Sequence, residues 1–534
     1  MKKRSSLLAF ALIALVTSFP AVATAETGSR VIPDHVALTW AGNPKTTQTI
    51  TWRCSAEVKS GTVEYAVGTD LGVETKKVTV KAAPYKSDLG IDSLFSATLT
   101  GLKKDTVYAY RVGNGSSWSE TATFRTAGSG DFEFLVFGDS QSGNADKPIY
   151  DPWRATLSAA FAANKNARFF VNMGDLVEIG YMQAHWNAWF DATKGVIDHI
   201  PEMPVQGNHE TYVDGGETVM DKPVSWLSQL PAPQNGPAGL KGQAYSYSVG
   251  NVDFFVLDSQ EDEESPKYGD ILAAQAAWLD KALTASTADF KLAFFHKTPY
   301  YNKAARANEA VKAAFCPILE KHHVDIVFNG HDHGLSRTYP VKGDSFFPDP
   351  KDGTVYYVTG RSGNKYYNDL TNKFWNAFFY DPQDQGVYLS VEVSGKKLTV
   401  TARKADGTVL DVYAIDKAGS GSTVTPVPAR LNATRTAAFG NFLSGVAMNP
   451  PMAKKGASGA WFCDLNALAA YLGARVTMGD GTAEIALGKA SAKIPADGLI
   501  LESGKPTLVS VDALKVLGIS ATYYPDLNVL SLVK

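Results

Sequence analysis

The sequence of 534 residues is poor in cysteine and has no excess of charge of either sign. Its three cysteines, Cys54, Cys316 and Cys463, lie far apart and are odd in number, which excludes a disulfide framework and a cysteine-rich metal site. We expect buried free thiols. The 51 basic and 54 acidic residues nearly cancel, and no dense Lys/Arg run follows the N-terminus. No nucleic-acid partner is therefore expected, because the basic surface that binds phosphate backbones is missing.

Long apolar runs are also missing, with one exception near the N-terminus. The basic residues Lys2–Arg4 precede an apolar run from Leu7 to Val16, and the small residues of Ala23–Ala25 follow. This order is typical of a secretory signal peptide, here residues 1–25. Because the run is shorter than the ~20 residues of a membrane span, no transmembrane anchor is expected beyond the signal peptide. We predict a secreted or cell-envelope protein.

Changes of pattern along the chain indicate three folded units. Short alternating strands between polar turns predict an all-β sandwich over residues 31–127. Over residues 131–415, apolar strands that end in polar clusters alternate with helical stretches, which favours an α/β layered domain. A Gly/Ser/Thr/Pro-rich linker, residues 418–429, leads to residues 430–534. There a helix followed by a hairpin recurs, which indicates a small α+β repeat domain.

Polar clusters follow the strands of the α/β region. They are Gly138-Asp139-Ser140-Gln141, Gly174-Asp175, Gly207-Asn208-His209-Glu210, His296, and Gly330-His331-Asp332-His333. Ligands of open α/β sheets bind beyond the carboxyl ends of the strands, so these clusters are expected to converge. Carboxylate, amide oxygen and imidazole together suit divalent metals. Two metals about 3.5 to 4 Å apart can hold a hydroxide and polarise a phosphoryl oxygen, which favours phosphate-ester cleavage.

Further residues are expected on the same rim. Arg361, Tyr300 and Tyr301 follow strand ends, and an arginine can bind a phosphate bidentately, so we predict substrate contacts for Arg361 and Tyr300. The acidic run Glu261–Glu264 also follows a strand and is expected to form a solvated loop.

The ordered clusters resemble the calcineurin-like metallophosphoesterase superfamily. Within it, Gly207–Glu210 and the stretch from Gly330 to Pro340 look like the purple acid phosphatase branch. The preceding sandwich is similar to the fibronectin type III-like domain that precedes the catalytic domain in that branch. The C-terminal segment, 430–534, resembles the copper amine oxidase N-terminal-like domain, which implies neither copper nor oxidase activity here.

This resemblance implies a four-layer metallophosphoesterase sandwich with two divalent or trivalent metal ions, drawn from Fe, Zn, Mn or Ni. Carried over by position, the first metal is held by Asp139, Gln141, Asp175 and His333. The second is held by Asp175 as the bridge, with Asn208, His296 and His331. Asn208 and His296 then also border the substrate, His209 is the general acid for the leaving oxygen, and Glu210 orients it.

Two positions depart from the family pattern. Most members place a histidine where this chain has Gln141, whose amide is a neutral and weaker ligand. Purple acid phosphatases place an iron-binding tyrosine where this chain has Glu178, and Tyr181 is the nearest tyrosine along the chain. We therefore expect a protein without the purple colour, even with iron bound.

The resulting hypothesis is an exported phosphatase. Metal-bound hydroxide attacks the phosphorus of a small phosphate monoester, and the chemistry is acid phosphatase-like. One alternative is a phosphodiesterase or 5'-nucleotidase, with Phe374–Tyr380 stacking on a base. Another is a non-catalytic surface protein whose C-terminal domain binds the cell wall or another surface partner.

Overall fold

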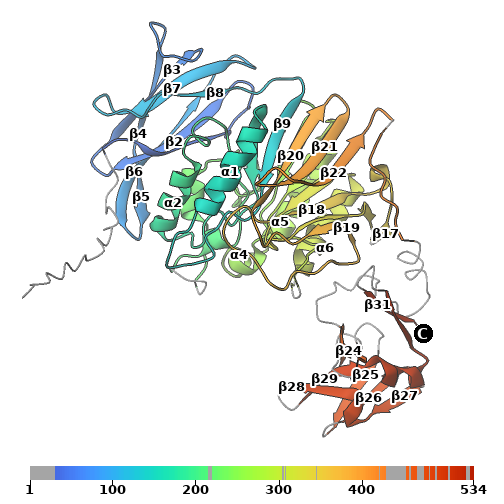
Figure 1. The fold of residues 1–534 in the computed structure, drawn as a ribbon. Coiled ribbons are helices and arrows are strands. Elements are labelled where there is room, and N and C mark those ends of the chain that lie inside the picture. Colours follow the sequence, from blue (N-terminus) through green and yellow to red (C-terminus); the bar gives the residue numbers. More distant parts are fainter. Residues whose placement is uncertain are drawn as a thin grey trace, which may run out of the picture.

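The structure is a computed structural model that describes most of the chain. It covers residues 31–214, 219–303, 306, 308–343, 345–419, 421–428, 453–455, 459–465, 469, 474–479, 482–487, 490–502, 505–524 and 529–533. The expected signal peptide lies outside the described residues. Figure 1 shows the N-terminal unit in blue, the central domain in green to orange and the C-terminal unit in red.

The N-terminal unit is the predicted β-sandwich. One sheet has the order β1 (Asp34–Thr39), β2 (Gln48–Ser55), β6 (Gly90–Leu99) and β5 (Ala83–Ser87). The other has the order β4 (Lys76–Lys81), β3 (Ser60–Val67), β7 (Val107–Gly113) and β8 (Ala122–Arg125). Inward-facing aromatic side chains fill the space between the sheets, and Trp52 stacks on Phe95 with ring centroids 5.2 Å apart.

Two mixed sheets form the centre of the second domain. The five-stranded sheet has the order β10 (Ala167–Asn172), β9 (Phe132–Phe137), β20 (Val387–Ser394), β21 (Lys397–Lys404) and β22 (Val409–Asp416). The seven-stranded sheet has the order β11 (Tyr245–Val249), β12 (Val252–Val256), β13 (Phe290–Phe294), β14 (Ile326–Asn329), β18 (Val355–Thr359), β15 (Leu335–Thr338) and β19 (Asn376–Tyr380). A small hairpin, β16 (Val341–Lys342) and β17 (Ser345–Phe346), and the short helix η2 (Pro350–Asp352) lie beside it.

The layers are helix, sheet, sheet, helix, which confirms the expected four-layer sandwich. Apolar side chains of both sheets pack between them, and Phe134 of β9 contacts Phe254 of β12 with ring centroids 5.4 Å apart. Helices α1 (Asp151–Ala163) and α2 (Gln183–Thr193) cover the five-stranded sheet, and α5 (Ile271–Ala285) and α6 (Glu309–Lys321) cover the other (Figure 1). The shorter helices are α3 (Val224–Gln229), α4 (Glu261–Tyr268) and η1 (His209–Thr211).

One local expectation was wrong. The acidic run Glu261–Glu264 is the first turn of α4, where four carboxylates meet the positive end of the helix dipole, and Glu264 is buried in an ion pair with Lys222.

The parallel strands bring the loops together. β9 and β10 are parallel neighbours in one sheet, and β12, β13, β14 and β18 run in parallel in the other. Because the carboxyl ends of parallel strands lie at one edge, the loops that follow β9, β10, β13, β14 and β18 leave the two sheets near one another. This edge carries the predicted polar clusters.

The sandwich and the central domain are joined through backbone pairing. Leu38 donates to the carbonyl oxygen of Ile197 (2.9 Å) and accepts from Glu202 (2.8 Å). The imidazole of His35 stacks on Phe190 of α2 with centroids 4.2 Å apart. These contacts attach β1 to α2 and the loop after it.

The segment predicted as a linker, residues 418–429, lies along the central domain over the part that is described. Thr423 donates to the carbonyl oxygen of Ala414 in β22, and Thr425 donates to that of Pro348. Val427 packs against the cluster beneath α5 and α6.

The C-terminal unit contains small antiparallel sheets. The first has the order β23 (Ala453–Lys455), β24 (Trp461–Asp464), β29 (Lys505–Ser510) and β28 (Leu499–Glu502). The second has the order β25 (Arg475–Gly479), β26 (Thr482–Leu487) and β27 (Ala490–Ile494), and the third is the hairpin β30 (Ser520–Tyr524) and β31 (Val529–Val533). The short helices are η3 (Ala496–Gly498) and η4 (Val511–Leu517). The second predicted helix is the short 3₁₀ helix η4, which ends at Gly518 with φ of 79°. The first predicted helix lies mostly outside the described residues.

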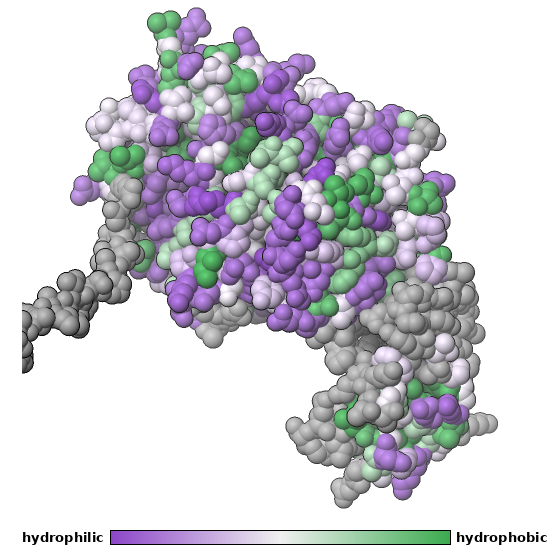
Figure 2. Space-filling model, viewed as in Figure 1, coloured by the Kyte–Doolittle hydropathy of each residue, from purple (hydrophilic) through white to green (hydrophobic). Residues whose placement is uncertain are grey.

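The surface in view is mixed in character. Figure 2 shows hydrophobic residues scattered in small groups among hydrophilic ones. Within the described chain, no helix combines the length and the apolar character needed to cross a membrane.

Candidate active site

The predicted clusters meet at the common edge of the two sheets. Asp139 follows β9, Asp175 follows β10, and His296 and His331 follow β13 and β14. Asp139, Asp175, His331 and His333 have φ of 38°, 51°, 74° and 58°, in the left-handed region. This conformation costs a non-glycine residue about 1 kcal/mol or more, and such strain gathers at functional sites.

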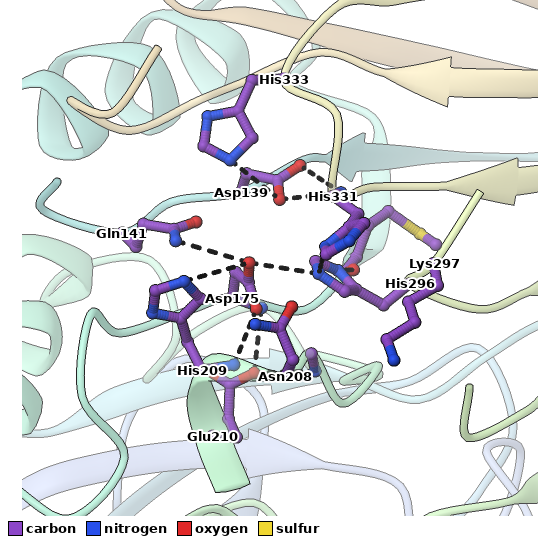
Figure 3. Close-up of polar contacts among 12 residues, drawn as sticks. Asp139, Gln141, Asp175, Asn208, His209, Glu210, His296, Lys297, His331 and His333 are labelled. Carbon is purple, nitrogen blue, oxygen red and sulfur yellow. Dashed lines mark hydrogen bonds and ion pairs between the residues drawn. The ribbon is translucent and has the colours of Figure 1, made fainter. Parts of the chain in front are cut away.

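The side chains form two groups that share Asp175. Asp175, His296 and His331 bring their ligand atoms within 4.8 Å of one another, and so do Asp139, Asp175 and His333. His296 Nε2 lies 3.1 Å from Asp175 Oδ2 and 3.1 Å from His331 Nδ1, while His333 Nε2 lies 3.4 Å from Asp139 Oδ1. Figure 3 shows Asp175 at the middle, with Gln141, His209 and His296 directed at it.

Backbone carbonyl groups fix the orientation of the imidazoles. His296 Nδ1 donates to the carbonyl oxygen of Met173 (2.7 Å), and His333 Nδ1 donates to that of Lys365 (2.9 Å). In both rings Nε2 therefore faces the site and is the nitrogen available to a metal ion. A carbonyl acceptor behind the ring is the usual support of a metal-binding histidine.

Three buried atoms of the site have no hydrogen-bond partner among the described residues. They are Gln141 Oε1, Asn208 Oδ1 and His333 Nε2. Buried polar atoms are rarely left unpaired, because each costs about 1–3 kcal/mol. All three are electron-pair donors from residues assigned to metal binding, so bound metal ions would supply the partner that each atom lacks. The donor set fits two divalent ions.

The electrostatics suit metal binding as well. Burial lowers the pKa of His331 and His333 well below the usual value, which keeps both imidazoles neutral and able to coordinate. Burial acts to raise the pKa of Asp175, but the charges of His296 and His209 outweigh it and hold that pKa well below its usual range. Asp175 is thus an ionised carboxylate at the centre of the site.

Glu210 does not orient His209. Its carboxylate accepts hydrogen bonds from the backbone N–H groups of Asp175, Leu176, Val177 and Gly207, at 2.8–3.2 Å. His209 is held by the carbonyl oxygen of Glu178, which its Nδ1 meets at 2.5 Å. Glu210 therefore holds together the two loops that carry Asp175 and Asn208. Burial, and to a smaller extent the charge of Asp175, raises the pKa of Glu210 to about 7.

Arg361 and Tyr300 are not placed against the metal ligands. Nε, Nη1 and Nη2 of Arg361 donate to the carbonyl oxygens of Pro382, Gly363 and Gln383, so its guanidinium binds backbone where substrate was expected. Tyr300 is buried in the core under the seven-stranded sheet, where its ring packs on Tyr356 at 4.6 Å. Both side chains are structural.

Several charged groups of the site were missed. Lys365 Nζ lies 3.1 Å from His209 Nε2 and 3.2 Å from Glu178 Oε1. Arg306 donates to Asp332 and to the carbonyl oxygen of His331. Lys297 is within 3.7 Å of three carboxylates in the first turn of α4. None of these lysines and arginines belongs to a strand-end cluster, so the sequence carried no signal for them beyond the position of Lys297 after His296.

Comparison with known proteins agrees with this geometry. Residues 33–126 match the family model "Purple acid Phosphatase, N-terminal domain", and residues 132–335 match "Calcineurin-like phosphoesterase". An uncharacterized protein of Mycobacterium tuberculosis is 24% identical over 388 residues, covering 64% of this chain and 70% of its own length. Purple acid phosphatase 18 of Arabidopsis thaliana is 26% identical over 366 residues, covering 66% of this chain and 76% of its own.

Solved structures show the same fold. A purple acid phosphatase from seeds of yellow lupin (Lupinus luteus) aligns with a TM-score of 0.59 and 18% identity, over 72% of this chain and 74% of its own. A structure of PhoD aligns with a TM-score of 0.50 and 13% identity, over 72% and 90%. The chain thus combines a purple acid phosphatase N-terminal domain, residues 33–126, with a calcineurin-like phosphoesterase domain, residues 132–335, and is a metal-dependent phosphoester hydrolase.

Proposed function

We propose that the protein is an exported phosphatase that hydrolyses small phosphate monoesters with two bound metal ions. One relative, from Arabidopsis thaliana, is called a probable inactive purple acid phosphatase, so activity has to be argued from the residues of this chain. The observation that carries the proposal is the pair of ligand groups joined by Asp175. Bound metals at such a pair supply Lewis-acid polarisation of a phosphoryl oxygen and activation of water.

His209 supports hydrolysis over a purely structural role for the metals. With Nδ1 donating to the carbonyl oxygen of Glu178, its Nε2 points into the site, 3.9 Å from Asp175 Oδ2. A proton held at Nε2 stands beside the shared carboxylate, where it can be delivered to a leaving oxygen. A purely structural metal site would need no acid at this position.

The aromatic stretch Phe374–Tyr380 gives little support to the nucleotide alternative. Phe374 and Trp375 are buried, and Trp375 packs on Tyr301 with centroids 5.3 Å apart. The rings of Phe374 and Trp375 therefore offer no face to a nucleobase. A monoesterase with a small leaving group needs no such slot.

The direct test is hydrolysis of p-nitrophenyl phosphate and bis-p-nitrophenyl phosphate by the full chain, stripped and reloaded with manganese, zinc, iron or nickel. Asp175→Asn should abolish metal-dependent turnover. Asp105→Asn is the matched control, because Asp105 is also an aspartate in the left-handed region, with φ of 50°, but lies in the N-terminal sandwich. Faster monoester turnover supports the proposal, and no turnover with any metal would overturn it.

Export is tested separately. The proposed signal peptide predicts that the full chain expressed in a bacterial host is found outside the inner membrane with a new N-terminus close to Glu26. N-terminal sequencing of the purified protein measures this. Recovery from inside the cell with Met1 intact would contradict export without affecting the enzymatic proposal.

A further inference from the structure

The positive charges around the metal ligands differ in what holds them. Lys297 Nζ is surrounded by Glu261, Asp262 and Glu263, at 3.7, 3.0 and 2.9 Å. Arg306 is tied to Asp332 and to the backbone of His331. In both cases the cation is already engaged by the protein, and neither is in contact with the predicted general acid.

Lys365 is different. Its Nζ has two partners among the described residues, Glu178 Oε1 at 3.2 Å and His209 Nε2 at 3.1 Å. Because Nδ1 of His209 donates to a carbonyl oxygen, Nε2 accepts from the lysine while His209 is neutral, and it no longer accepts once it carries the proton of the general acid. An ammonium group has three donors, so at least one remains for another acceptor. The side chain is 19% exposed, which leaves it open on one side.

The backbone around Lys365 is fastened to the loop of metal ligands. Ser362, Gly363 and Asn364 donate through their backbone N–H groups to the carbonyl oxygens of Gly138, Asp139 and Gln141, at 2.7–3.1 Å. The two loops are so close that a Cβ on Gly363 would lie 2.3 Å from the carbonyl oxygen of Ser140.

Two further contacts complete this arrangement. The Nη1 group of Arg361 donates to the carbonyl oxygen of Gly363 at 2.6 Å, and the carbonyl oxygen of Lys365 itself accepts from His333. These hydrogen bonds fix the position of the loop that carries Lys365 relative to Asp139 and His333. The backbone therefore places the lysine at the site, and its position does not depend on the flexibility of its side chain alone.

Both carboxylate oxygens of Glu178 are engaged within the protein. One of its carboxylate oxygens binds Lys365 and the other accepts from the backbone N–H of Gly143 at 2.6 Å. The position that holds a tyrosine ligand in the resembled family is therefore occupied here by the counter-ion of a lysine. The site gains a cation next to His209 in place of a metal ligand.

We propose that Lys365 is a catalytic residue that binds a phosphoryl oxygen of the substrate and gives the site its preference for phosphate monoesters over diesters. This inference rests on the proposed function. A monoester carries close to two negative charges at neutral pH and a diester one, so a cation beside the phosphate favours the monoester. A hydrogen bond from a charged group to phosphate is strong and short, and one lost contact of this kind corresponds to roughly a 10- to 150-fold change in binding.

The experiment compares Lys365→Met with Lys365→Arg in the metal-loaded full chain. For Lys365→Met we expect kcat/KM for p-nitrophenyl phosphate to fall roughly 10- to 150-fold, and that for bis-p-nitrophenyl phosphate by less than about fivefold. Lys365→Arg should recover most of the monoester activity, because it keeps the charge. Lys417→Met is the matched control, since Lys417 is also an ion-paired lysine, 2.7 Å from Asp325, but Asp325 precedes β14 and so lies at the end of that strand opposite to the site.

Metal content and thermal unfolding are measured on every variant. An equal loss on both esters with both metals present would overturn the proposal, because Lys365 would then act on a step common to the two reactions. Loss of metal or of the folded state in both Lys365 variants would also overturn it and assign the lysine a structural role.

A binding measurement separates this inference from the proposed function. Inorganic phosphate is titrated calorimetrically into metal-loaded wild type and Lys365→Met. The dissociation constant should rise about 10-fold or more in the variant. Equal constants would overturn the role of Lys365, whereas a difference in constants without turnover of any ester would keep that role and overturn the proposed hydrolysis.

Discussion

The two halves of the metal centre share Asp175 but are built from different residues. One half has two imidazoles, His296 and His331, beside the amide of Asn208. The other has one imidazole, His333, with the carboxylate of Asp139 and the neutral amide of Gln141. Imidazole is the stronger ligand for zinc-like ions, so the half with two histidines should bind its metal more tightly. We therefore expect one firmly held metal and one that exchanges more easily.

The positive charges next to the two halves of the metal centre differ as well. Behind His296, Lys297 is neutralised by the carboxylates of α4. Beside His333, the charge of Lys365 is shared between Glu178 and His209 and stays partly exposed. The more weakly held metal therefore lies beside the cation that we assign to the substrate.

The largest effect is expected when the shared ligand is compared with an unshared one. Asp175→Asn should remove both metals and lower monoester hydrolysis by roughly a thousandfold or more, because both halves lose their common carboxylate. Asp139→Asn should lose the metal of its own half only. Metal content by mass spectrometry and turnover of p-nitrophenyl phosphate measure the difference. Equal metal contents in the two variants would show that Asp175 is not shared.

The histidines test the halves directly. His296→Asn and His333→Asn should each lower the affinity for one metal by more than about a hundredfold. Loss of a residue that only supports a ligand already lowers metal affinity by up to about a hundredfold, and here the ligand itself is lost. The ion that remains should be the more tightly bound one in His333→Asn and the more weakly bound one in His296→Asn. Competition with a chelator ranks the two. The reverse order would contradict the assignment of the tighter site to His296 and His331.

A smaller effect is expected from strengthening the weaker half. Gln141→His puts an imidazole where most of the resembled family has one, and should raise the affinity for the second equivalent of zinc roughly tenfold. Gln141→Ala is the companion variant and should lower it. No change in either variant would show that Gln141 does not face a metal.

The smallest effect concerns the acidic turn behind His296. Burial raises the pKa of Glu261 to about 7 from 4.5, with Lys297 acting in the opposite direction. The folded state therefore holds a proton that the unfolded state has lost, so the contribution of Glu261 to stability is present below pH 4.5 and declines as the pH rises through 7.

Glu261→Gln removes this decline. As the pH rises from 4.5 to 8, we expect the free energy of unfolding of the metal-free variant to increase by about 1–2 kcal/mol relative to that of the metal-free wild type. Urea denaturation at several pH values measures it, and Glu392→Gln, on the exposed side of β20, is the control. Parallel curves for wild type and Glu261→Gln would contradict the raised pKa.

The fold and the metal ligands could be predicted because they follow from local sequence. Asp139, Asp175 and His331 each stand just after an apolar strand and a glycine, and the parallel pairing of β9 with β10 and of β13 with β14 brings such positions to one edge. The pattern of strands also predicted the sandwich of residues 31–127.

Contacts between loops could not be predicted in this way. Arg361 looked like the cation of the rim because it follows β18, yet its donors all reach backbone carbonyl groups of a neighbouring turn. Lys365, four residues later, carries no motif, and only the pairing of residues 362–364 with 138–141 places it beside His209. Tyr300 was likewise expected on the rim, but its ring fits the core beneath the sheet.

The central feature of the proposed site is a pair of metals that share Asp175. The measurement that tests this directly is a titration of the stripped wild-type protein with zinc, in which bound metal and turnover of p-nitrophenyl phosphate are followed together. We predict that two ions bind in separate steps and that hydrolysis begins only with the second. Full activity after one equivalent, or saturation at a single ion per chain, would contradict the account.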